Sequence, residues 1–375
     1  MFRKFTVMQL LPALDVGGVE RGTVEISAAL VKAGHQAIVV SAGGKLVNEL
    51  RELGAQHIEM PIGEKNILSV RHIKSLRELI AARQVDIVHA RSRLPAWIGY
   101  RAIQGLNAAR RPRWVTTVHG PYSVNFYSKI MTSGEKVIAI SDFIRNYITQ
   151  NYPTVRAERI TVIARGIDRE RYPYDYRPSD AWRLSWRSHY PQFEGRRLLV
   201  LPGRITRWKG HSEFISMIAE LIKRGHAVHG LIAGGVSGQR VAYERELRNL
   251  VAEKGLHEHV TFLGNRDDLR EVLASADIAY SLTLEPEAFG RTTIEALSLG
   301  VPVIGYDHGG TGEILREVLP GGLVPSNDIS HAVETTCRFL QARIEVPKTH
   351  PFTLGKMQDE TLAVYEGLYN AGPSR

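Results

Sequence analysis

Two glutamates eight residues apart, Glu287 and Glu295, lie where the sequence predicts a loop running into a helix. The apolar run 278–282 has the composition of a strand, Gly290 interrupts the loop after it, and apolar residues recur at helical spacing from Thr292 onward. A helix N-terminus offers unpaired N–H groups and the positive end of a dipole, which suits a phosphate. Two carboxylates placed on either side of it could bracket a nucleotide sugar, with hydroxyls at both ends and phosphates between.

Each of these carboxylates also has a purely structural explanation. A glutamate in a first helical turn usually compensates the helix dipole, and a loop glutamate is usually solvated. The whole stretch is more specific than either residue, because one strand-like run precedes it and a second, 301–305, follows it. Gly290 removes a side chain where a ligand would need to approach the backbone.

Two cations, Arg204 and Lys209, follow the strand-like run 198–201 within a Gly-Arg and Lys-Gly frame. From the end of a strand both can reach one diphosphate, the arginine through its planar fork and the lysine as a point charge. The alternative is a pair of solvated surface cations. A further cation, Arg266, follows the run 260–264 and could border a base pocket or help to cap a helix.

The first half of the chain offers a glycine-rich turn and a histidine. Gly17 and Gly18 lie between the strand-like run 5–11 and a helix, where glycines let a phosphate or sugar come close to the backbone. A merely tight turn is the alternative, and the dinucleotide pattern G-x-G-x-x-G is absent. His119 follows the run 114–118 at the expected mouth of a strand, where a catalytic and a structural role are both open.

Strand-like and helical segments alternate along the chain, which indicates an α/β protein with a parallel, doubly wound sheet in each half. Ligands of such sheets bind at the carboxyl ends of the strands, where His89, Arg91 and Ser141 also lie; Ser141 is the expected N-cap of a helix at 143–148. The stretch 172–193 shows little periodicity and is interpreted as a linker. The expected strands are 5–11, 37–41, 85–90, 114–118, 136–140, 160–163, 198–201, 231–235, 260–264, 278–282 and 301–306, with a terminal helix at 357–369.

Length and composition bound the class of protein. With 375 residues, of which 43% are apolar, two globular domains are the natural expectation. No apolar run is long enough for a membrane span, and the short one near the N-terminus lacks a signal-peptide cleavage site. The single cysteine, Cys337, excludes an internal disulfide framework and is expected to be buried and inert in a helix.

Positive charge is concentrated in the first half of the chain. Residues 1–170 contain 24 lysines and arginines against 14 aspartates and glutamates, whereas the remainder has a net charge of −1. A basic half suggests an anionic partner, with general solubility as the alternative. Aromatic and basic residues interleaved between 94 and 136 suit a membrane surface, although a buried helix face with a solvated edge explains them slightly better. They include Trp97, Tyr100, Phe126 and Tyr127 beside Arg110, Arg111 and Arg113.

Taken in order, these motifs resemble those of the retaining glycosyltransferases of family four. The resemblance covers nearly the whole chain and rests on the Gly17-Gly18 turn with Glu20-Arg21, His119-Gly120, Arg165-Gly166-Ile167-Asp168, Gly203-Arg204 with Lys209-Gly210, the stretch from Glu287 to Glu295, and Gly309-Gly310. It implies the GT-B architecture, in which two Rossmann-like domains face a cleft and the C-terminal helix crosses back to the first domain. Residues 1–170 with about 352–375 would form the acceptor-binding domain, and 171–351 the nucleotide-sugar-binding domain.

The resemblance also implies a role for each candidate residue. Arg204 and Lys209 would neutralise the departing nucleoside diphosphate, and Glu295 would bind the ribose hydroxyls. Glu287 would hold hydroxyls of the sugar, and His119 would touch the donor sugar near the reacting carbon. Further donor contacts would come from Gly17, Gly18, Arg266, Phe289, Gly290, Arg291 and Thr292, several of them through backbone N–H groups.

The activity so implied is transfer of a hexose, with retention of configuration, from a nucleoside diphosphate sugar to an anionic glycolipid or lipopolysaccharide core. A UDP-sugar is the favoured donor, no further cofactor is expected, and nucleic acid is not an expected partner. Because no Asp-x-Asp occurs, a metal-bound diphosphate is not indicated, and cations and helix dipoles would supply the charge stabilisation. The expected location is the cytoplasm, at the inner face of the membrane. The alternatives are a sugar-nucleotide epimerase, a transferase with a small soluble acceptor, and a catalytically silent carbohydrate-binding protein.

Overall fold

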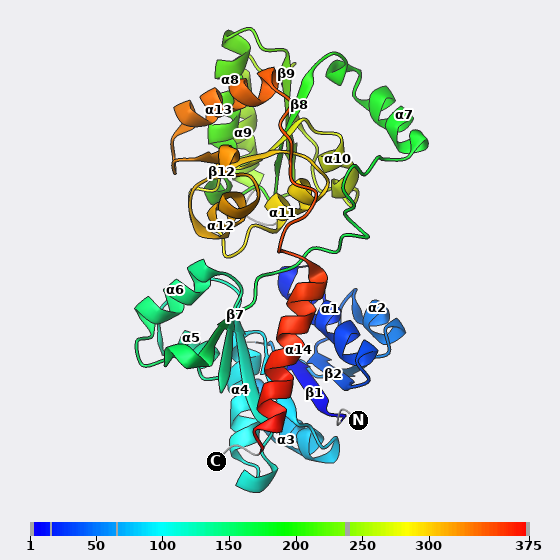
Figure 1. The fold of residues 1–375 in the computed structure, drawn as a ribbon, viewed down its shortest axis with the longest axis vertical. Coiled ribbons are helices and arrows are strands. Elements are labelled where there is room, and N and C mark those ends of the chain that lie inside the picture. Colours follow the sequence, from blue (N-terminus) through cyan, green and yellow to red (C-terminus); the bar gives the residue numbers. More distant parts are fainter. Residues whose placement is uncertain (1–3, 16, 65–66, 237–240, 373–375) are drawn as a thin grey trace. The chain divides into compact units, whose positions relative to one another are not determined.

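The computed structural model of the chain describes residues 4–15, 17–64, 67–236 and 241–372. The chain divides into two compact units, one formed by residues 1–166 with 354–375 and the other by residues 167–353 (Figure 1). This division lies a few residues from the boundaries at 170 and 351 that the order of the motifs suggested. Each unit is a parallel sheet covered by helices.

The first unit contains a seven-stranded sheet in the order β3-β2-β1-β4-β5-β6-β7, with every neighbouring pair parallel. The order reverses between β1 and β4, which marks the topological switch point of this sheet. The central strands are buried runs rich in valine and isoleucine, as expected when both faces are covered. The strands are β1 Thr6–Leu10, β2 Gln36–Ser41, β3 Gln56–Glu59, β4 Ile87–Ala90, β5 Arg113–Val118, β6 Lys136–Ala139 and β7 Ile160–Val162.

The last helix of the chain belongs to this first unit. It is α14, Leu354–Asn370, and it packs against α1. Met357, Tyr365 and Leu368 on α14 are buried in the same core cluster as the side chains of β1, which confirms the expected return of the terminal helix. The other helices of the unit are α1 Gly18–Lys32, α2 Val47–Glu52, α3 His72–Ala82, α4 Arg93–Gln104, α5 Phe126–Lys129 and α6 Asp142–Asn151, with short 3-10 turns at η1 Ile67–Arg71, η2 Ala108–Arg110, η3 Ile130–Thr132 and η4 Ala157–Arg159.

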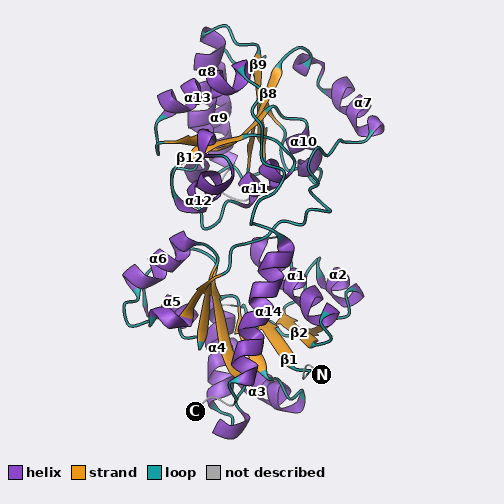
Figure 2. Cartoon of the chain, viewed as in Figure 1, coloured by secondary structure: helices purple, strands orange, loops and turns teal. Residues whose placement is uncertain are grey.

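The second unit contains a six-stranded parallel sheet in the order β10-β9-β8-β11-β12-β13 (Figure 2). Here the order reverses between β8 and β11. The strands are β8 Arg197–Pro202, β9 Val228–Ala233, β10 Val260–Phe262, β11 Ile278–Ser281, β12 Val303–Tyr306 and β13 Leu323–Val324. The helices are α7 Asp180–His189, α8 His211–Lys223, α9 Val241–Glu253, α10 Leu269–Ala274, α11 Arg291–Ser298, α12 Gly309–Val318 and α13 Ile329–Gln341, with turns at η5 Pro191–Phe193, η6 Arg207–Lys209 and η8 Pro320–Gly322.

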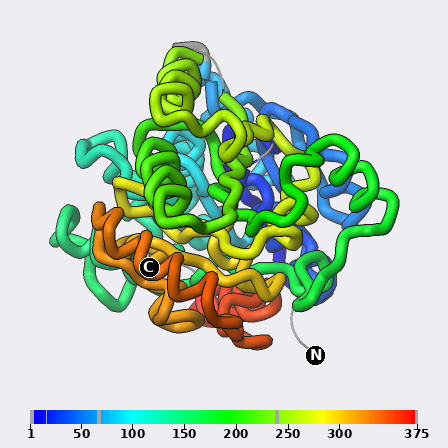
Figure 3. The backbone as a smooth tube through the Cα atoms, turned by 90° about the horizontal axis from the view of Figure 1, so that it is seen from above, coloured from blue at the N-terminus to red at the C-terminus, as the bar shows by residue number. Residues whose placement is uncertain are grey.

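The interpretation of 172–193 as a linker is wrong for its second half, which forms α7 and the turn η5. Ser179 caps α7, because its hydroxyl accepts a hydrogen bond from the N–H of Trp182 at 3.2 Å. The buried residue of α7 is Trp186, and Trp182, one turn before it, is half-buried, so the helix shows no aliphatic periodicity. The helix lies at the edge of the second unit, on the opposite side from α13 (Figure 1, Figure 3).

Three smaller features also differ from expectation. The strand β3 has the polar sequence Gln-His-Ile-Glu at a sheet edge, and β13 has two residues, so neither gives an apolar signal. Cys337 lies on α13 as expected, but its side chain is only half-buried, and its Sγ lies 3.3 Å from Nε2 of His226.

The predicted N-cap at Ser141 is confirmed, since its hydroxyl accepts from the N–H of Ile144.

Candidate functional site

The two loops that hold the predicted donor residues meet at the carboxyl edge of the second sheet. Lys209 ends the turn after β8, Glu287 lies in the loop after β11, and the two largely buried side chains form an ion pair. The ammonium of Lys209 also lies 4.5 Å from the ring centroid of Trp208. Arg204 projects from the same loop as Lys209 and is exposed. The structure therefore brings a cation and a carboxylate together where ligands of α/β sheets bind.

Gly290 has a different local role from the one expected of it. Its backbone adopts φ 91°, and a Cβ there would lie 2.8 Å from Oγ1 of Thr311. The N–H of Gly310 donates to the carbonyl of Glu287 at 2.7 Å, so the start of α12 packs directly on this loop. The missing side chain at Gly290 thus accommodates α12 and a left-handed backbone. Phe289 is buried beside it, with its ring 5.9 Å from that of Phe352.

Glu295 is buried on α11 and already has partners within the second unit. Nε of Arg291 donates to its carboxylate at 3.1 Å, and the hydroxyl of Tyr172 also bonds to it. Burial raises the pKa of Glu295 above its ordinary value, although Arg291 opposes this shift. Burial and the nearby Glu295 raise the pKa of Tyr172 to about 12. Thr292 follows Arg291 in the first turn of α11 and is partly exposed.

Arg266 follows β10, and its guanidinium is engaged by neighbouring side chains. Its guanidinium forms two hydrogen bonds with the carboxylate of Asp268, at 2.7 and 2.5 Å, and lies 5.7 Å from the ring centroid of Trp186. Nε1 of Trp182 donates to the same carboxylate at 2.7 Å. Arg266 and Asp268 therefore connect the loop after β10 to α7.

Reasoning from the sequence missed Tyr172 and also His211, the first residue of α8. His211 is buried immediately after the Arg204–Gly210 loop, and burial lowers its pKa to about 4 although the neighbouring backbone of Thr206 opposes that shift. A neutral ring thus supports the loop that carries Lys209. The position after Gly210 is the only signal the sequence offers for it, and Tyr172 has none beyond an aromatic-rich stretch.

In the first unit, His119 ends β5 and is hydrogen-bonded to an arginine. Nη2 of Arg165 lies 2.5 Å from Nδ1 of His119, and the N–H of His119 lies 3.3 Å from the hydroxyl of Tyr122. Burial holds the pKa of His119 well below its ordinary value, and Arg165 and Arg91 lower it further. The imidazole is therefore neutral at physiological pH.

Gly17 and Gly18 lie at the start of α1, after β1. A Cβ at Gly17 would lie 2.3 Å from Oε2 of Glu20, whereas nothing lies within 4 Å of a Cβ at Gly18. The carboxylate of Glu20 thus folds back over the N-terminus of α1, where it compensates the dipole. A phosphate approaching this turn would meet that carboxylate.

The aromatic and basic residues between 94 and 136 do not form one surface. Arg110 precedes β5, and Phe126 follows its other end, so the length of a strand, roughly 20 Å, separates them. Arg111 donates to the carbonyls of Leu106 and Gln104. Arg113 pairs with Glu135 and donates to the carbonyl of Leu368. These arginines therefore have local structural partners.

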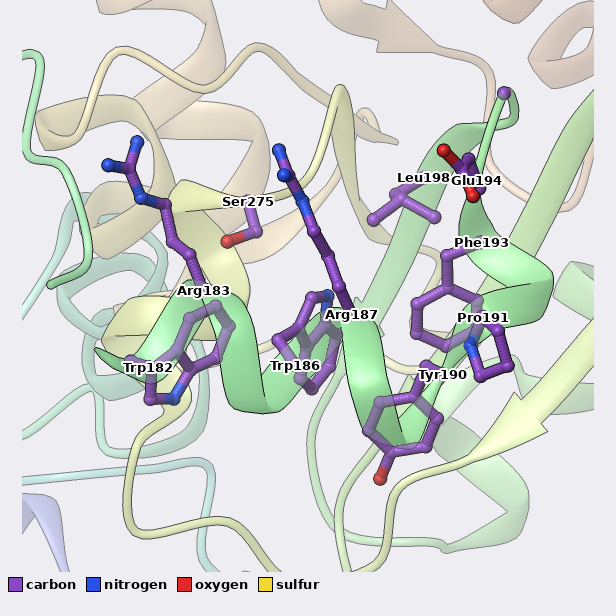
Figure 4. Close-up of a pocket in the computed structure, with 11 residues that line it drawn as sticks. Trp182, Arg183, Trp186, Arg187, Tyr190, Pro191, Phe193, Glu194, Leu198 and Ser275 are labelled. Carbon is purple, nitrogen blue, oxygen red and sulfur yellow. The ribbon is translucent and has the colours of Figure 1, made fainter. Parts of the chain in front are cut away.

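A cavity of about 480 Å³ lies in the second unit, beside the aromatic rings that Arg266 approaches and not among the residues around Lys209 and Glu287 (Figure 4). Its floor is a row of aromatic rings from α7 and η5, with the side chains of Arg183 and Arg187 rising above it. It also touches Leu198, at the start of β8, and Ser275, just before β11. It therefore opens at the amino edge of the sheet, opposite the edge that holds Lys209 and Glu287.

Within the described ranges of the chain, no group of three or more histidine, cysteine, aspartate or glutamate side chains is arranged to hold a metal ion. No helix among those residues is both long and apolar enough to cross a membrane.

Comparison with known families matches both halves of the chain. The family described as "Glycosyltransferase Family 4" matches residues 16–171, and "Glycosyl transferases group 1" matches residues 183–349. Among solved structures, a glycosyltransferase from Rickettsia africae superposes with a TM-score of 0.86 and 29% identity, over 98% of this chain and 99% of that one. Anabaena Alr3699/HepE, solved with UDP and glucose, has the same fold with a TM-score of 0.77 and 18% identity, over 97% and 100% of the two chains.

Curated relatives match over part of their length. A D-inositol 3-phosphate glycosyltransferase of Nocardia farcinica is 31% identical over 53% of this chain and 44% of its own. The lipopolysaccharide core biosynthesis mannosyltransferase LpsB of Rhizobium meliloti is 26% identical over 49% of this chain and 51% of its own. The chain thus spans about half the length of the curated relatives it matches.

Proposed function

Because the chain belongs to the GT-B glycosyltransferases, whose family models match both of its units, we propose that it transfers a hexose from a nucleoside diphosphate sugar to an anionic acceptor, with retention of configuration. The observation that carries this proposal is the ion pair of Lys209 and Glu287 at the carboxyl edge of the second sheet. A cation suited to a diphosphate and a carboxylate suited to sugar hydroxyls lie there side by side.

In this proposal the second unit binds the donor. Arg204 and Lys209 hold the diphosphate, and Glu287 accepts hydrogen bonds from the sugar. Backbone N–H groups from Phe289 to Thr292 lie at the start of α11, where the helix dipole favours an anion. Glu295 binds the ribose after exchanging its contacts with Arg291 and Tyr172. A UDP-sugar is the first donor to test, because a protein of the same fold has been solved with UDP.

His119 contributes a neutral hydrogen-bond donor from the first unit. Since arginine can only donate, Nδ1 of His119 must accept from Arg165, and the ring proton then lies on Nε2. As the bond to the diphosphate breaks, negative charge grows on the leaving phosphate, and Arg204 with Lys209 stabilises it.

We infer that this charge stabilisation needs no metal ion, since the chain has no Asp-x-Asp and supplies two cations. Activity is therefore expected to survive EDTA. Loss of activity with EDTA, restored by Mn²⁺ or Mg²⁺, would contradict this inference.

The proposed acceptor carries negative charge, as a glycolipid, a lipopolysaccharide core or a small phosphorylated sugar alcohol. Two observations support this: residues 1–170 have an excess of ten positive charges, and the named relatives act on inositol phosphate or build lipopolysaccharide core. Binding at the inner face of the membrane follows if the acceptor is a lipid.

The proposal is tested by incubating the full chain with a panel of nucleotide sugars, with and without phosphorylated acceptors, and identifying products by mass spectrometry. Transfer to an acceptor supports it, whereas conversion of the nucleotide sugar without an acceptor would indicate an epimerase. Lys209→Ala is expected to cost about 2–4 kcal/mol in kcat/KM, because a partner of the leaving phosphate is lost. Lys223→Ala, at an exposed lysine at the end of α8, is the matched control. Near-normal activity of Lys209→Ala would contradict the assignment of Lys209 to the leaving diphosphate.

A further inference from the structure

Two arginines of the first unit converge beside α1. Arg91 directly follows β4 and is only 2% exposed, and Arg165 follows β7. A Cβ at Gly22 of α1 would lie 2.5 Å from Nη1 of Arg165 and 3.5 Å from Nη1 of Arg91. The two nitrogens are thus at most 6.0 Å apart. Like charges at such a distance repel each other, and an anion bound between them would offset that repulsion.

Arg91 and His119 each have side-chain nitrogens without a hydrogen-bond partner. Nε and Nη1 of Arg91 and Nε2 of His119 are buried, and none of the three has an acceptor within the part of the chain that the structure describes. Because Nδ1 of His119 accepts from Arg165, the unpartnered Nε2 carries the proton and is a donor. All three unpartnered atoms are therefore donors. Buried polar groups are nearly always hydrogen-bonded, so this set indicates a ligand rich in acceptor oxygens.

Arg91 has neighbours within the first unit. Glu25 acts on it electrostatically, and the hydroxyl of Tyr365 bonds to it. His89 bonds to Tyr365 and Thr117 through its two ring nitrogens, at 2.6 and 2.7 Å, and burial holds its pKa well below its ordinary value. This histidine is therefore neutral and adds no further charge to the two guanidinium groups.

The position of the cluster in the fold is also that of a binding site. Arg91 follows β4 and α1 follows β1, and these are the neighbouring strands at which the order of the first sheet reverses. In open parallel sheets, ligands bind outside the carboxyl ends of the strands at this switch point. The donors of Arg91 and His119 lie at the carboxyl ends of β4 and β5.

We propose that Arg91, Arg165 and His119 form a binding site in the first unit for the anionic group, a phosphate or a carboxylate, of the acceptor. This inference rests on the proposed transferase function and adds the residues that would bind the anionic group of the acceptor. The cations assigned to the donor diphosphate, Arg204 and Lys209, belong to the second unit. Bidentate guanidinium contacts fix both the position and the orientation of such a group.

The test measures binding of three ligands to the full chain by calorimetry: inositol 3-phosphate as a phosphorylated acceptor, plain inositol as its uncharged counterpart, and UDP as the donor product. Wild type is expected to bind inositol 3-phosphate at least tenfold more tightly than inositol. Arg91→Gln and Arg165→Gln are expected to abolish this preference and to leave UDP affinity within twofold. Arg101→Gln, at an exposed arginine on α4, is the matched control. Arg165→Lys retains the positive charge and is expected to keep part of the preference for inositol 3-phosphate. It replaces Arg165→Gln in the test if that variant folds poorly.

The outcomes separate this inference from the proposed function. Phosphate preference unchanged in both glutamine variants would overturn the site, while UDP binding and transfer activity would still support a transferase. A loss of UDP affinity with phosphate preference intact would assign the arginines to the donor and overturn the acceptor assignment. Failure of wild type to bind any nucleotide would refute the transferase, whereas a phosphate preference that depends on Arg91 would still support an anion site.

Discussion

Lys209 and Glu287 neutralise each other across the loops after β8 and β11, so a change at either residue alters the charge that a ligand meets at the other. We expect Glu287→Gln to bind UDP at least as tightly as wild type, because Lys209 then has no competing carboxylate. The same variant should lose the additional affinity for the nucleotide sugar, since the amide is a weaker hydrogen-bond acceptor for sugar hydroxyls than the carboxylate. Glu295→Ala should weaken the binding of both UDP and the UDP-sugar. Calorimetric titration with UDP and with the UDP-sugar checks both variants, and equal losses for the two ligands in Glu287→Gln would reverse the assignment.

If Glu295 binds the ribose as proposed, donor binding should be sensitive to mild acid. Burial raises its pKa above the ordinary 4.5, so as the pH falls this carboxylate becomes protonated earlier than an exposed glutamate. A protonated group accepts ribose hydroxyls less well, and affinity for a nucleotide sugar should therefore fall as the pH drops towards and through that raised pKa. Glu295→Gln should show a weaker affinity that stays flat over the same range. If the affinity of Glu295→Gln for the nucleotide sugar still falls with pH, the group that titrates is a residue other than Glu295.

At the scale of single residues, the sequence predicted which side chains lie at strand ends but not what they contact. Lys209 and Glu287 are far apart in the chain, and their pairing depends on β8 and β11 being neighbours in the sheet. Gly290 illustrates the same limit, since its missing side chain accommodates Thr311 from a segment about twenty residues later. Arg165 was recognised only as part of a motif, and its contact with His119 required the alignment of β5 and β7 through β6.

At the scale of elements, α7 is held to the second unit by its aromatic side chains. The ring of Trp186 lies 4.8 Å from Trp182, 4.6 Å from Tyr190 and 5.5 Å from Phe193. We expect Trp186→Ala to lower the free energy of unfolding of this unit by about 3–5 kcal/mol, as for other buried aromatic truncations. Leu184→Ala, at an exposed position on the same helix, should change it by about 0.5 kcal/mol or less. Denaturant unfolding followed by circular dichroism measures both, and a similar small effect for the two would show that the cluster does not hold α7.

Elements with long apolar runs were predicted well because their signal is local. Strands such as β1, β2, β8 and β12 are buried on both faces and read as continuous apolar segments. Edge strands β3 and β13 are stabilised by pairing with β2 and β12 rather than by their own composition, so no apolar run marks either of them in the sequence. The helix α7 was overlooked for a related reason, since its stability comes from stacking on η5 and on Arg266.

At the scale of the whole molecule, the division into two units was predictable because each half repeats the alternation of strands and helices. The return of α14 to the first unit depends on side chains such as Tyr365, which is buried against His89. The distribution of basic and aromatic side chains over the surface could not be predicted from the sequence, because the arginines around Arg110 and the aromatic residues around Phe126 lie at opposite ends of β5. Membrane binding is therefore expected only of the aromatic end, where the side chains are exposed.

This aromatic end is the segment around α5, where Val124 is 56% and Phe126 77% exposed and Lys129 is exposed beside them. Exposed apolar side chains next to a cation suit the interfacial layer of an anionic membrane. We expect the protein to co-sediment with anionic vesicles more than with neutral ones, and less as salt rises and screens the attraction. Replacing Val124 and Phe126 together by serine, or Lys129 by glutamate, should reduce this binding several-fold. Val241→Ser and Lys223→Glu, at similarly exposed positions of the second unit, are the controls and should leave it unchanged. If wild type ignores anionic vesicles at low salt, a soluble acceptor is favoured, and the transferase proposal is unaffected because its donor residues lie in the other unit.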